Sequence, residues 1–385
     1  MQSIFRTPKI LSDFRVHWCE GTHKMKVALM SMESKSSQMT LDAMKKYFSE
    51  VDSINIKELE VKLGGKELSI LYNGKPLPEY SCIYAKGSFR YAPLLRSITT
   101  AFYNTAYMPI KPNSFTIVHD KLLTHLALQY NKVPMPETYV VSSIEASKKI
   151  LEQVKYPIII KFPQGTQGKG VMFAESFAAA SSMLDAIDNL KNPFLIQEYI
   201  ETEGSDIRAI VVGDKVVAAM KRKAAGEDKR ANLHAGGKGE SIVLDAYSKK
   251  IAVNASKCIG AEICGVDMLE TVKGPQVIEA NLSPGLQGIT SVTKVDVADS
   301  IAKYLYEKTK EFTEKGKSTE TSKMFEDLGV GKAGKSDSEQ QIITNLDFRS
   351  ERILLPKIVS NITKFDEKDE VVIKAKKGKI NLEKF

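Results

Sequence analysis

The sequence contains no apolar run that approaches the ~18 residues expected of a membrane-spanning helix, although 43% of its 385 residues are hydrophobic. It also has few cysteines, and none of the four forms a C-x-x-C pair: Cys19, Cys82, Cys258 and Cys264. Isolated thiols are typical of a reducing compartment, and they argue against a disulfide framework or a zinc site. We therefore expect a cytoplasmic protein with no membrane segment, long enough for two or three domains.

Two common phosphate-binding patterns are also missing. The chain has no G-x-x-x-x-G-K-[ST] motif, and no G-x-G-x-x-G that follows a strand and opens a helix. It has no Cys/His or Ser/His/Asp arrangement that would indicate covalent catalysis. These absences favour a flexible glycine hairpin over a rigid phosphate loop at a helix N-terminus, and they fit a chemistry that needs no side-chain nucleophile.

A glycine-rich loop lies between two apolar runs. Residues 157–162 and 171–174 are predicted strands, and the loop between them carries Gly165, Gly168 and Gly170 beside lysines. Glycine permits positive φ angles and close approach of the backbone to a ligand. With Lys161 and Lys169 adjacent, the loop indicates a ligand that carries phosphates. The alternative is an ordinary hairpin loop with solvated lysines.

Oxygen ligands converge on a second predicted hairpin, residues 266–281, which turns at residues 273–275. Side chains alternate faces along a strand, so Glu279 and Asn281 share one face while Ile278 and Ala280 pack behind. Asp267 lies on the partner strand. Two carboxylates and an amide oxygen suit Mg²⁺, which prefers oxygen ligands and contacts substrate phosphates. An amphipathic hairpin with a wet polar face is the alternative.

A basic stretch separates these two regions. Residues 221–238 contain six Lys/Arg and two acids, together with several glycines. A charge run is usually a solvated loop. Here the glycines and Asn232 favour a loop that closes over an anion.

These features, in this order and spacing, resemble the ATP-grasp ligases and, more narrowly, the RimK-like glutamate ligases. The resemblance runs from about residue 25 to about residue 310. Its motifs are Lys161 with Gly165 to Gly168, Gln197 to Ile200, Asp206 with Arg208, Arg230 to His234, Asp267, and Glu279 to Gly285. One departure is Thr290, where RimK relatives commonly carry an acid.

The resemblance implies roles for individual positions. The implied ATP-binding residues are Lys121, Lys161, Gly165, Thr166, Gln167, Gly168, Gly170, Gln197, Glu198, Tyr199, Ile200, Asp206, Arg230 and Asn232. Among them, residues 165–170 would form a flexible lid, Glu198 and Ile200 would face the adenine, and Asp206 would bind the ribose. The implied metal ligands are Asp267, Glu279 and Asn281. Lys161, Arg222 and Arg230 are the implied catalytic residues, and Arg222 and Ser283 would contact a substrate carboxylate.

The resemblance also implies the chemistry. ATP phosphorylates a carboxylate to an acylphosphate, an amine attacks, and phosphate leaves as an amide bond forms. Such a site needs positioning and charge neutralisation, supplied by lysines, arginines and two Mg²⁺ (or Mn²⁺) ions. The implied amine is that of L-glutamate, and the acceptor is the carboxyl end of a protein, peptide or cofactor.

The expected fold is α/β and α+β. Residues 25–113 would form a pre-ATP-grasp α/β domain with a parallel sheet, and residues 114–310 an ATP-grasp domain of two α+β subdomains. Within the first domain we expect strands at residues 25–30 and 81–85, helices around residues 41–48 and 91–102, and a hairpin at Asn73-Gly74. Residues 1–24 lack the apolar core of a signal peptide and are expected to be an extension, with Met25 as an alternative start.

The tail has a different composition. Residues 311–345 are rich in Lys, Glu, Ser, Thr and Gly, which predicts a flexible linker. Residues 346–385 predict a strand, a short helix near Pro356 and a hairpin turning at Lys377-Gly378. This pattern is similar to the AbrB-like swapped-hairpin module, a small β-rich unit. A unit this small cannot bury a stable core alone, so the resemblance implies a homodimer.

Other functions remain open at this point. The net charge of +8 permits nucleic-acid binding without favouring it. An ATP-sensing DNA-binding regulator is the competing class, and loss of a metal ligand would favour it. Within the ligases, another amino acid, a γ-linkage, or a carrier-protein acceptor is an alternative.

Overall fold

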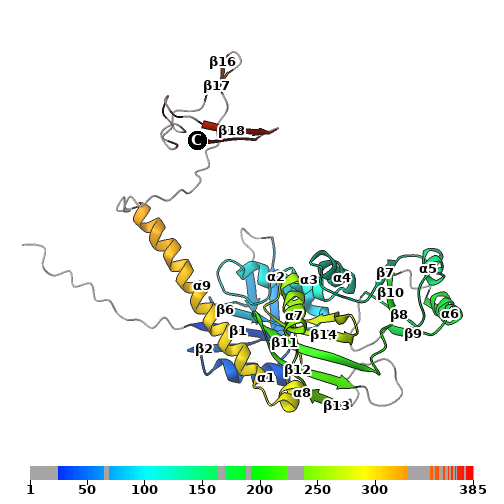
Figure 1. Cartoon of the computed structure of the whole chain (residues 1–385). Coiled ribbons are helices and arrows are strands. Elements are labelled where there is room, and N and C mark those ends of the chain that lie inside the picture. The colour runs from blue at the N-terminus through cyan, green and yellow to red at the C-terminus, as the bar shows by residue number, and fades with distance from the viewer. Residues whose placement is uncertain are drawn as a thin grey trace, which may run out of the picture. The chain divides into compact units, whose positions relative to one another are not determined.

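The chain divides into two compact units, Met1–Thr321 and Ser322–Phe385. The computed structural model describes residues 25–64, 69–163, 170–187, 192–223, 238–327, 347–349, 352–354, 371–376 and 379–384, with residues 359, 363, 366 and 369 (Figure 1). None of the helices in these ranges combines the length and apolarity that crossing a membrane requires. The predicted extension, residues 1–24, lies outside the described residues.

The first layer is a parallel sheet with strand order β2-β1-β6: β1 (Lys26–Ser31), β2 (Glu50–Asn55) and β6 (Cys82–Ala85). Helices α1 (Lys35–Met44) and α2 (Ala92–Phe102) flank it. The expected parallel sheet is confirmed, because β1 pairs in parallel with both β2 and β6. Strand β1 is almost wholly buried, which is typical of a parallel sheet that is covered on both faces. An antiparallel sheet of β3 (Leu59–Lys62), β4 (Ser69–Tyr72) and β5 (Lys75–Pro76) follows the order β3-β4-β5.

The helix expected around residues 41–48 is placed too late. Helix α1 begins at Lys35 because Ser34 is its N-cap, with the Ser34 Oγ accepting from the Ser37 N–H at 3.2 Å. The Asn73-Gly74 hairpin is confirmed: both residues have positive φ angles, 51° and 73°, and they join β4 to β5.

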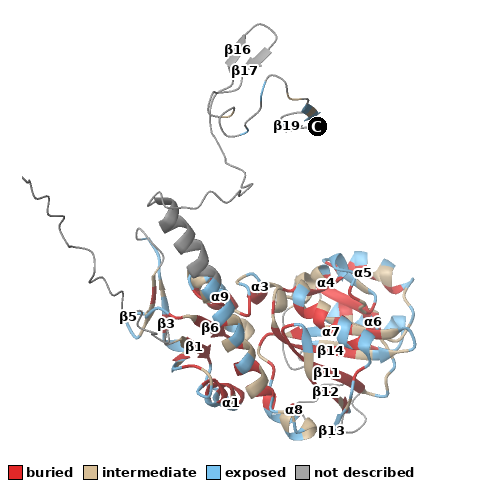
Figure 2. Ribbon diagram, turned by 60° about the vertical axis from the view of Figure 1, so that its left-hand side comes forward, coloured by how far each residue is buried: buried red, intermediate tan, exposed pale blue. Residues whose placement is uncertain are grey.

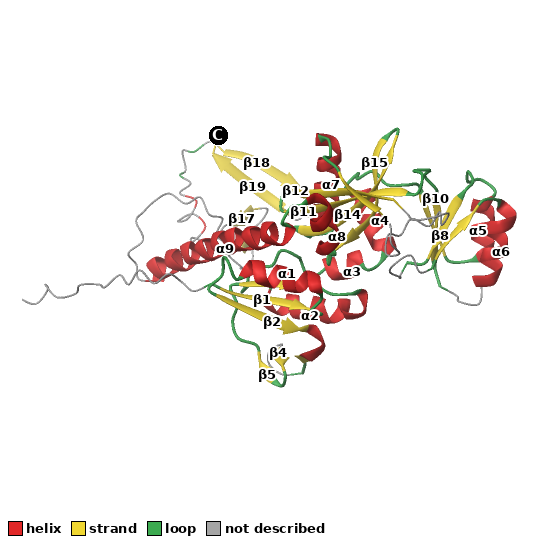
Figure 3. Cartoon of the chain, turned by 90° about the horizontal axis from the view of Figure 1, so that it is seen from below, coloured by secondary structure: helices red, strands yellow, loops and turns green. Residues whose placement is uncertain are grey.

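A second layer is the antiparallel sheet β7-β10-β8-β9: β7 (Thr138–Val141), β8 (Ile158–Lys161), β9 (Val171–Ala174) and β10 (Phe194–Glu198). Helices α5 (Ile144–Leu151) and α6 (Phe177–Ile187) pack on it with their own small core (Figure 3). The predicted strands β8 and β9 pair from Ile158↔Ala174 to Lys161↔Val171. Most of the glycine loop, residues 164–169, lies outside the described residues.

The third layer is the antiparallel sheet β13-β12-β11-β14-β15. Its strands are β11 (Ser205–Val212), β12 (Lys215–Lys223), β13 (Lys238–Ser241), β14 (Ile263–Thr271) and β15 (Gly274–Asn281). Every residue of β11 is buried, and Figure 2 shows buried residues along the strands of this sheet. Helix α7 (Ala246–Cys258) packs against β11, β12, β14 and β15 and so covers one face. The β14–β15 hairpin turns at Val272 and Lys273, slightly earlier than expected.

Helices α3 (Ser114–Val118), α4 (Lys121–Tyr130) and α8 (Leu286–Thr293) complete the body, and α9 (Val297–Asp327) follows. The first turns of α9 dock by the buried side chains of Val297, Ile301 and Leu305. Tyr304 of α9 and Tyr107 donate hydrogen bonds to the same Glu262 Oε2, at 2.7 and 2.5 Å. These contacts attach the helix to the first unit.

Helix α9 continues to Asp327, so residues 311–327 are helical where composition predicted a flexible linker. The Glu and Lys residues there have high helix propensity, and the docked first turns already supply the costly nucleus. The remaining domain boundaries stay predictions.

The second unit contains two hairpins. Strands β16 (Asp347–Arg349) and β17 (Arg352–Leu354) form one, and β18 (Val371–Lys376) and β19 (Lys379–Lys384) form the other. The two strands of this predicted hairpin are therefore confirmed, whereas its expected turn, Lys377-Gly378, lies outside the described residues. The short helix expected near Pro356 lies largely outside the described residues.

Candidate active site

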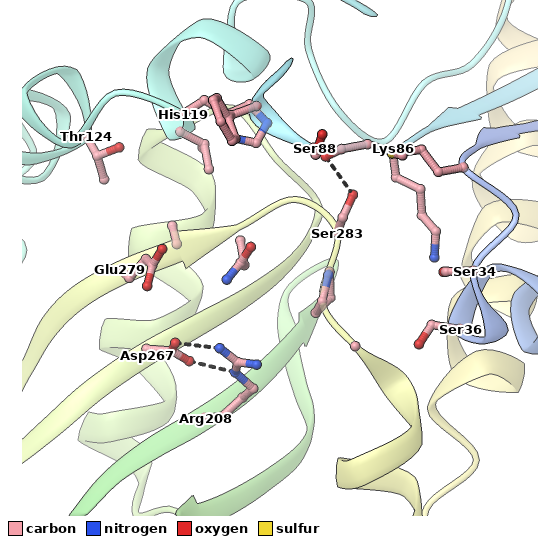
Figure 4. A pocket seen from close by; sticks show the side chains of 18 of the residues that line it. Ser34, Ser36, Lys86, Ser88, His119, Thr124, Arg208, Asp267, Glu279 and Ser283 are labelled. Atoms are coloured by element: carbon pink, nitrogen blue, oxygen red, sulfur yellow. Dashed lines mark hydrogen bonds and ion pairs between the residues drawn. The ribbon is translucent and has the colours of Figure 1, made fainter. Parts of the chain in front are cut away.

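A cavity of about 490 Å³ lies within the first unit, between the parallel sheet and the five-stranded sheet. Figure 4 shows its two ends: Arg208, Asp267 and Glu279 project from the sheet strands, while Lys86 reaches toward Ser34 beside α1. Its volume is that of a small-molecule site. The predicted residues among its lining are Lys121, Arg222, Asp267, Glu279, Asn281 and Ser283.

Two buried ion pairs form the floor of the sheet end. The Arg208 Nε and Nη2 donate to Asp267 Oδ1 and Oδ2 at 2.8 and 2.6 Å. Arg222 makes the same two-point contact with Asp206, at 2.6 and 2.5 Å, and its Nη2 also lies 3.0 Å from Asp267 Oδ2. The strand register creates both pairs, because Arg208 lies opposite Asp267 and Arg222 opposite Asp206.

These pairs decide the charge state of the acids. Burial opposes ionisation of Asp267, but the Arg208 and Arg222 guanidinium groups outweigh it and hold the pKa of that carboxyl below its ordinary value. Burial raises the pKa of Asp206, although Arg222 opposes the change. Asp206 does not line the cavity, and both of its oxygens are engaged by Arg222.

Asp267, Glu279 and Asn281 share the face of the sheet that lines the cavity, as predicted. Asp267 pairs with Glu279, and Asn281 follows two residues later opposite Gly265. The expectation that Ile278 packs behind this face is wrong, because the β14–β15 ladder contains a bulge. Met268 pairs with Val277, so Ile278 is an extra residue that lines the cavity, while Ala280 is buried.

The donor chemistry of this face fits a divalent cation. Burial raises the pKa of Glu279, and the negative charge of Asp267 raises it further, while Lys121, Arg208 and Lys161 oppose the change. A cation between the two carboxylates would relieve their repulsion. Across the described ranges no group of three His, Cys, Asp or Glu could hold a metal ion, so a cation on this face would take the amide oxygen of Asn281 as its third protein donor.

A buried polar chain connects Lys161 to the start of α4. The Lys161 Nζ donates to Gln197 Oε1 at 2.6 Å, and the Gln197 Nε2 donates to Thr138 Oγ1 at 2.8 Å and contacts His125 Nε2 at 3.1 Å. The His125 Nδ1 lies 2.6 Å from the Lys121 carbonyl oxygen. His125 is therefore a neutral imidazole with its proton on Nδ1, in keeping with a pKa that burial lowers.

Lys161 is a cation held away from water. Burial lowers its pKa to about 8, Glu279 partly restores it, and Lys121 lowers it further. Burial also lowers the pKa of Lys121, while Glu279 and Asp120 oppose that change. Two lysines with reduced hydration near one carboxylate face favour an anion in between.

The other predicted ATP contacts that the structure describes lie in or beside the four-stranded sheet β7-β10-β8-β9. Glu198 is exposed at the end of β10, where its Oε2 accepts from the Glu137 N–H at 3.3 Å. The Tyr199 ring packs edge-on to Phe173 with centroids 4.9 Å apart. Gly170 has a φ of 76°, and a Cβ there would lie 3.1 Å from Phe162. Neither Ile200 nor these residues line the cavity. Gly165, Thr166, Gln167, Gly168, Arg230 and Asn232 lie outside the described residues.

Several cavity residues have no role assigned from the sequence, among them Arg208, His119 and Lys86. Arg208 has a usable signal, because it follows Asp206 by two residues and so shares its face of the strand. His119 and Lys86 lie in loops, where no periodicity locates a side chain. The His119 Nε2 is buried with no hydrogen-bond partner in the part of the chain that the structure describes.

Comparison with solved structures shows that the chain has the ATP-grasp fold. The ATP-grasp ligase PsnB, complexed with minimal precursor, Mg and ADP, aligns with a TM-score of 0.59 at 19% identity, over 74% of this chain and 96% of that one. The D-alanine–D-alanine ligase from Bacillus anthracis, complexed with ATP, aligns with a TM-score of 0.54 at 16% identity, over 75% and 99%. These similarities establish the expected fold.

Sequence comparison gives the family. The profile described as RimK-like ATP-grasp domain matches residues 118–305. A probable alpha-L-glutamate ligase of Marinomonas sp. (strain MWYL1) is 36% identical over 295 residues, covering 73% of this chain and 95% of the relative. One from Pseudoalteromonas atlantica is 36% identical over 298 residues, covering 74% and 96%. The chain belongs to the RimK-like ATP-grasp family and is an ATP-dependent carboxylate–amine ligase.

The polar chain beneath the site generates one prediction. Replacing Gln197 by Leu (Gln197→Leu) leaves the buried Lys161 ammonium without its acceptor, and should lower the free energy of unfolding by about 1–3 kcal/mol. Chemical denaturation measures this. The exposed Gln153→Leu is the matched control and should change stability by less than about 0.5 kcal/mol. Equal effects of the two substitutions would contradict the assigned role of Gln197.

Proposed function

We propose that this ligase joins the amino group of L-glutamate to a carboxyl group at the end of a protein, peptide or cofactor. The observation that carries the proposal is the cavity face of Asp267, Glu279 and Asn281, with Arg208 and Arg222 beneath it. The names of the relatives support glutamate as the amino acid. The structure of PsnB complexed with precursor peptide PsnA2 supports a peptide as the acceptor.

Asp267, Glu279 and Asn281 are the proposed ligands of Mg²⁺, or Mn²⁺, with two ions bound when ATP is present. The complex of PsnB with Mg and ADP supports this choice. The cation would supply charge neutralisation for the phosphates. Arg208 orients Asp267 for this task, because it fixes both carboxylate oxygens from the side opposite Glu279.

Lys121 and Lys161 are the proposed contacts to ATP phosphates, and residues 165–170 the lid above them. In the first step a carboxylate oxygen of the acceptor attacks the γ-phosphorus and ADP leaves. In the second step the amine attacks the acyl carbon, the phosphate leaves, and the amine loses a proton. Neither step uses a side-chain nucleophile, so the cationic residues act by positioning and by stabilising charge.

The sheet geometry refines three proposed roles, those of Arg222, Asp206 and Gln197. Arg222 is held by Asp206 on one side and approaches Asp267 on the other, so its guanidinium is fixed at the edge of the cavity. This supports Arg222 as a preorganised contact for a substrate carboxylate. It also supports Asp206 as a positioning residue for Arg222 in place of a ribose ligand. Gln197 is likewise better suited to orienting Lys161 than to contacting adenine. Arg230 and Asn232 keep the roles that the resemblance implies.

The tail is proposed to dimerise the enzyme as an AbrB-like module. In the β18–β19 hairpin, Ile373 pairs with Leu382 and Ala375 with Ile380, so these side chains share one face. Ile373 and Ile380 are 63% and 57% exposed. Two strands cannot bury such a face alone, whereas a second copy would cover it. Nucleic-acid binding is less favoured, and no observation supports a regulator without ligase activity.

The direct test is an assay with purified protein, MgATP, single amino acids and a glutamate-terminated peptide. We expect peptide-dependent phosphate release with L-glutamate and a mass gain of one glutamyl unit on the peptide. Release with a different amino acid would replace glutamate as the substrate. No release with any pairing, despite ATP binding, would contradict peptide glutamylation.

The metal face gives a second prediction. Glu279→Gln or Asp267→Asn should lower turnover by at least about 100-fold, because each removes a charged ligand from the site. The exposed Glu270→Gln on the same hairpin is the control and should retain the wild-type rate. As a readout besides activity, Mg²⁺ should raise the melting temperature of the ATP-bound wild type and not that of Glu279→Gln. Wild-type rates in either site variant would reject the assignment.

The tail gives a third prediction. Truncation before residue 340 should leave a catalytically competent monomer, whereas light scattering should show the full chain to be a dimer. In the full chain, Ile373→Lys should also give a monomer, because it places a charge on the shared apolar face. Lys374→Ala, on the opposite face of the same strand, should remain dimeric. A truncated protein that is still dimeric would show that another surface forms the interface.

A further inference from the structure

The cavity has a second end, which the metal and phosphate roles do not use. Lys86 lies there, directly after β6, and is only 5% exposed. Its ammonium has no hydrogen-bond or ion-pair partner among the described residues, and its nearest aromatic contact is the Tyr84 ring at 5.8 Å. The backbone N–H of Lys86 donates to the Met30 carbonyl at 2.9 Å, so the loop is fixed to β1. A buried lysine is costly unless an anion compensates it.

The amino ends of two helices meet beside this lysine. Ser34 is the N-cap of α1, and Ser36 in the first turn accepts from the Leu286 N–H, the first residue of α8, at 2.9 Å. Ser36 therefore ties the two helix ends together. Helix N-termini carry partial positive charge and favour anions. Neither α1 nor α8 has an acidic residue in its first turn to neutralise that charge.

The acidic residues of the cavity lining lie at one end only, although cations line both ends. These acids, Asp267 and Glu279, both belong to the sheet end. The other end is lined by Lys35, Lys86 and several hydroxyl groups: Ser34, Ser36, Ser37, Ser88 and Ser283. Ser34 and Ser37 are joined through their hydroxyls at 3.0 Å, and the Ser283 hydroxyl donates to the Gly87 carbonyl at 3.3 Å. The loops that carry this end are thus connected to one another.

We propose that Lys86 and the amino ends of α1 and α8 form a subsite for a substrate carboxylate that does not react. This inference depends on the proposed ligase reaction, in which the activated carboxylate lies at the sheet end near Asp267 and Glu279. A glutamate that reacts through its amine keeps both carboxylates, and an acidic acceptor keeps those that are not activated. Binding one of them at the far end of the same cavity would orient the reacting group toward the metal face.

The test compares Lys86→Met, which removes the charge but keeps a chain of similar shape, with Lys86→Arg, which keeps the charge. Lys86→Met should raise the KM of one substrate by about 10- to 100-fold, the loss expected for a charge-assisted hydrogen bond. The KM for ATP should be unchanged, and Lys86→Arg should recover most of the lost affinity. Lys45→Met, at the opposite end of α1 and outside the cavity, is the control.

The two possible sources of the carboxylate give different results. An increased KM for the amino acid assigns the subsite to the incoming glutamate, and an increased KM for the peptide assigns it to the acceptor. Unchanged values for both substrates in an active Lys86→Met enzyme would overturn the subsite while leaving the ligase function intact.

Equilibrium binding separates the subsite from the proposed function. Glutarate, a dicarboxylate without an amine, is titrated into wild type and Lys86→Met by calorimetry. Binding that requires Lys86 supports the subsite even if no pairing of substrates turns over. Equal binding to both proteins, or none to wild type, would overturn it.

A measurement on the wild type alone covers the case in which the variant does not fold. Burial lowers the pKa of Lys86 to about 8, so its positive charge is present below that pH and is lost above it. Glutarate affinity should therefore fall as the pH rises from 7 to 9.5, a range in which its own carboxylates stay ionised. The groups facing Lys86 do not mask this change: burial raises the pKa of Tyr84 and lowers that of His119, and Lys35 is at the exposed rim. A constant affinity across this range would contradict the proposal.

Discussion

The structure of the site depends on two arginine–carboxylate pairs buried in one antiparallel sheet. Arg208 and Arg222 come from neighbouring strands, and each faces an acid that the strand register places opposite it. Ion pairs of this kind contribute little net stability, because removing two charges from water costs about as much as their attraction returns. Their main effect is to fix the positions of the Asp206 and Asp267 carboxylates. Asp267 is ionised and fixed on both oxygens, and it faces the cavity beside Glu279 before any ligand arrives.

Two lysines near the site, Lys161 and Lys86, are not paired with its carboxylates. Lys161 is held by Gln197 in a neutral polar chain, and Lys86 lies among hydroxyl groups and helix ends, so both retain the capacity to attract an anion. The acids are concentrated on one strand pair. The carboxylates of the cavity are therefore confined to one end, where Lys121, Arg208 and Arg222 accompany them, whereas the other end has cationic and hydroxyl groups without an acid. A substrate with two charged ends would have a preferred direction in such a space.

The sequence predicts the parts of this site that have a local signal. Alternating residues located Glu279 and Asn281, glycines located the loop between β8 and β9, and an Asn-Gly pair located the β4–β5 turn. Local sequence patterns could not identify Lys86 and His119. Their place in the cavity depends on how the sheets and helices of the first unit pack together, and not on neighbouring residues in the chain. Helix α1 was placed too late because its first turn is rich in serine, which has only modest helix propensity; a tertiary contact to α8 stabilises that turn. The linker prediction after residue 310 missed that a docked helix propagates through residues that would not start one.

The bulge at Ile278 has a consequence for how β15 serves two environments. Before the bulge the odd-numbered residue Val277 packs into the core under α7, and after it the even-numbered residue Ala280 does so. A strand without the extra residue would have to turn either its hydrophobic side chains or its carboxylate the wrong way. One inserted residue changes the phase of the alternation while the strand stays hydrogen-bonded to β14 on both sides of it. The hydrogen-bonded ladder thus continues through the bulge, while the residues of β15 that line the cavity begin at Ile278. One strand therefore contributes both to the hydrophobic core and to the surface of the candidate site.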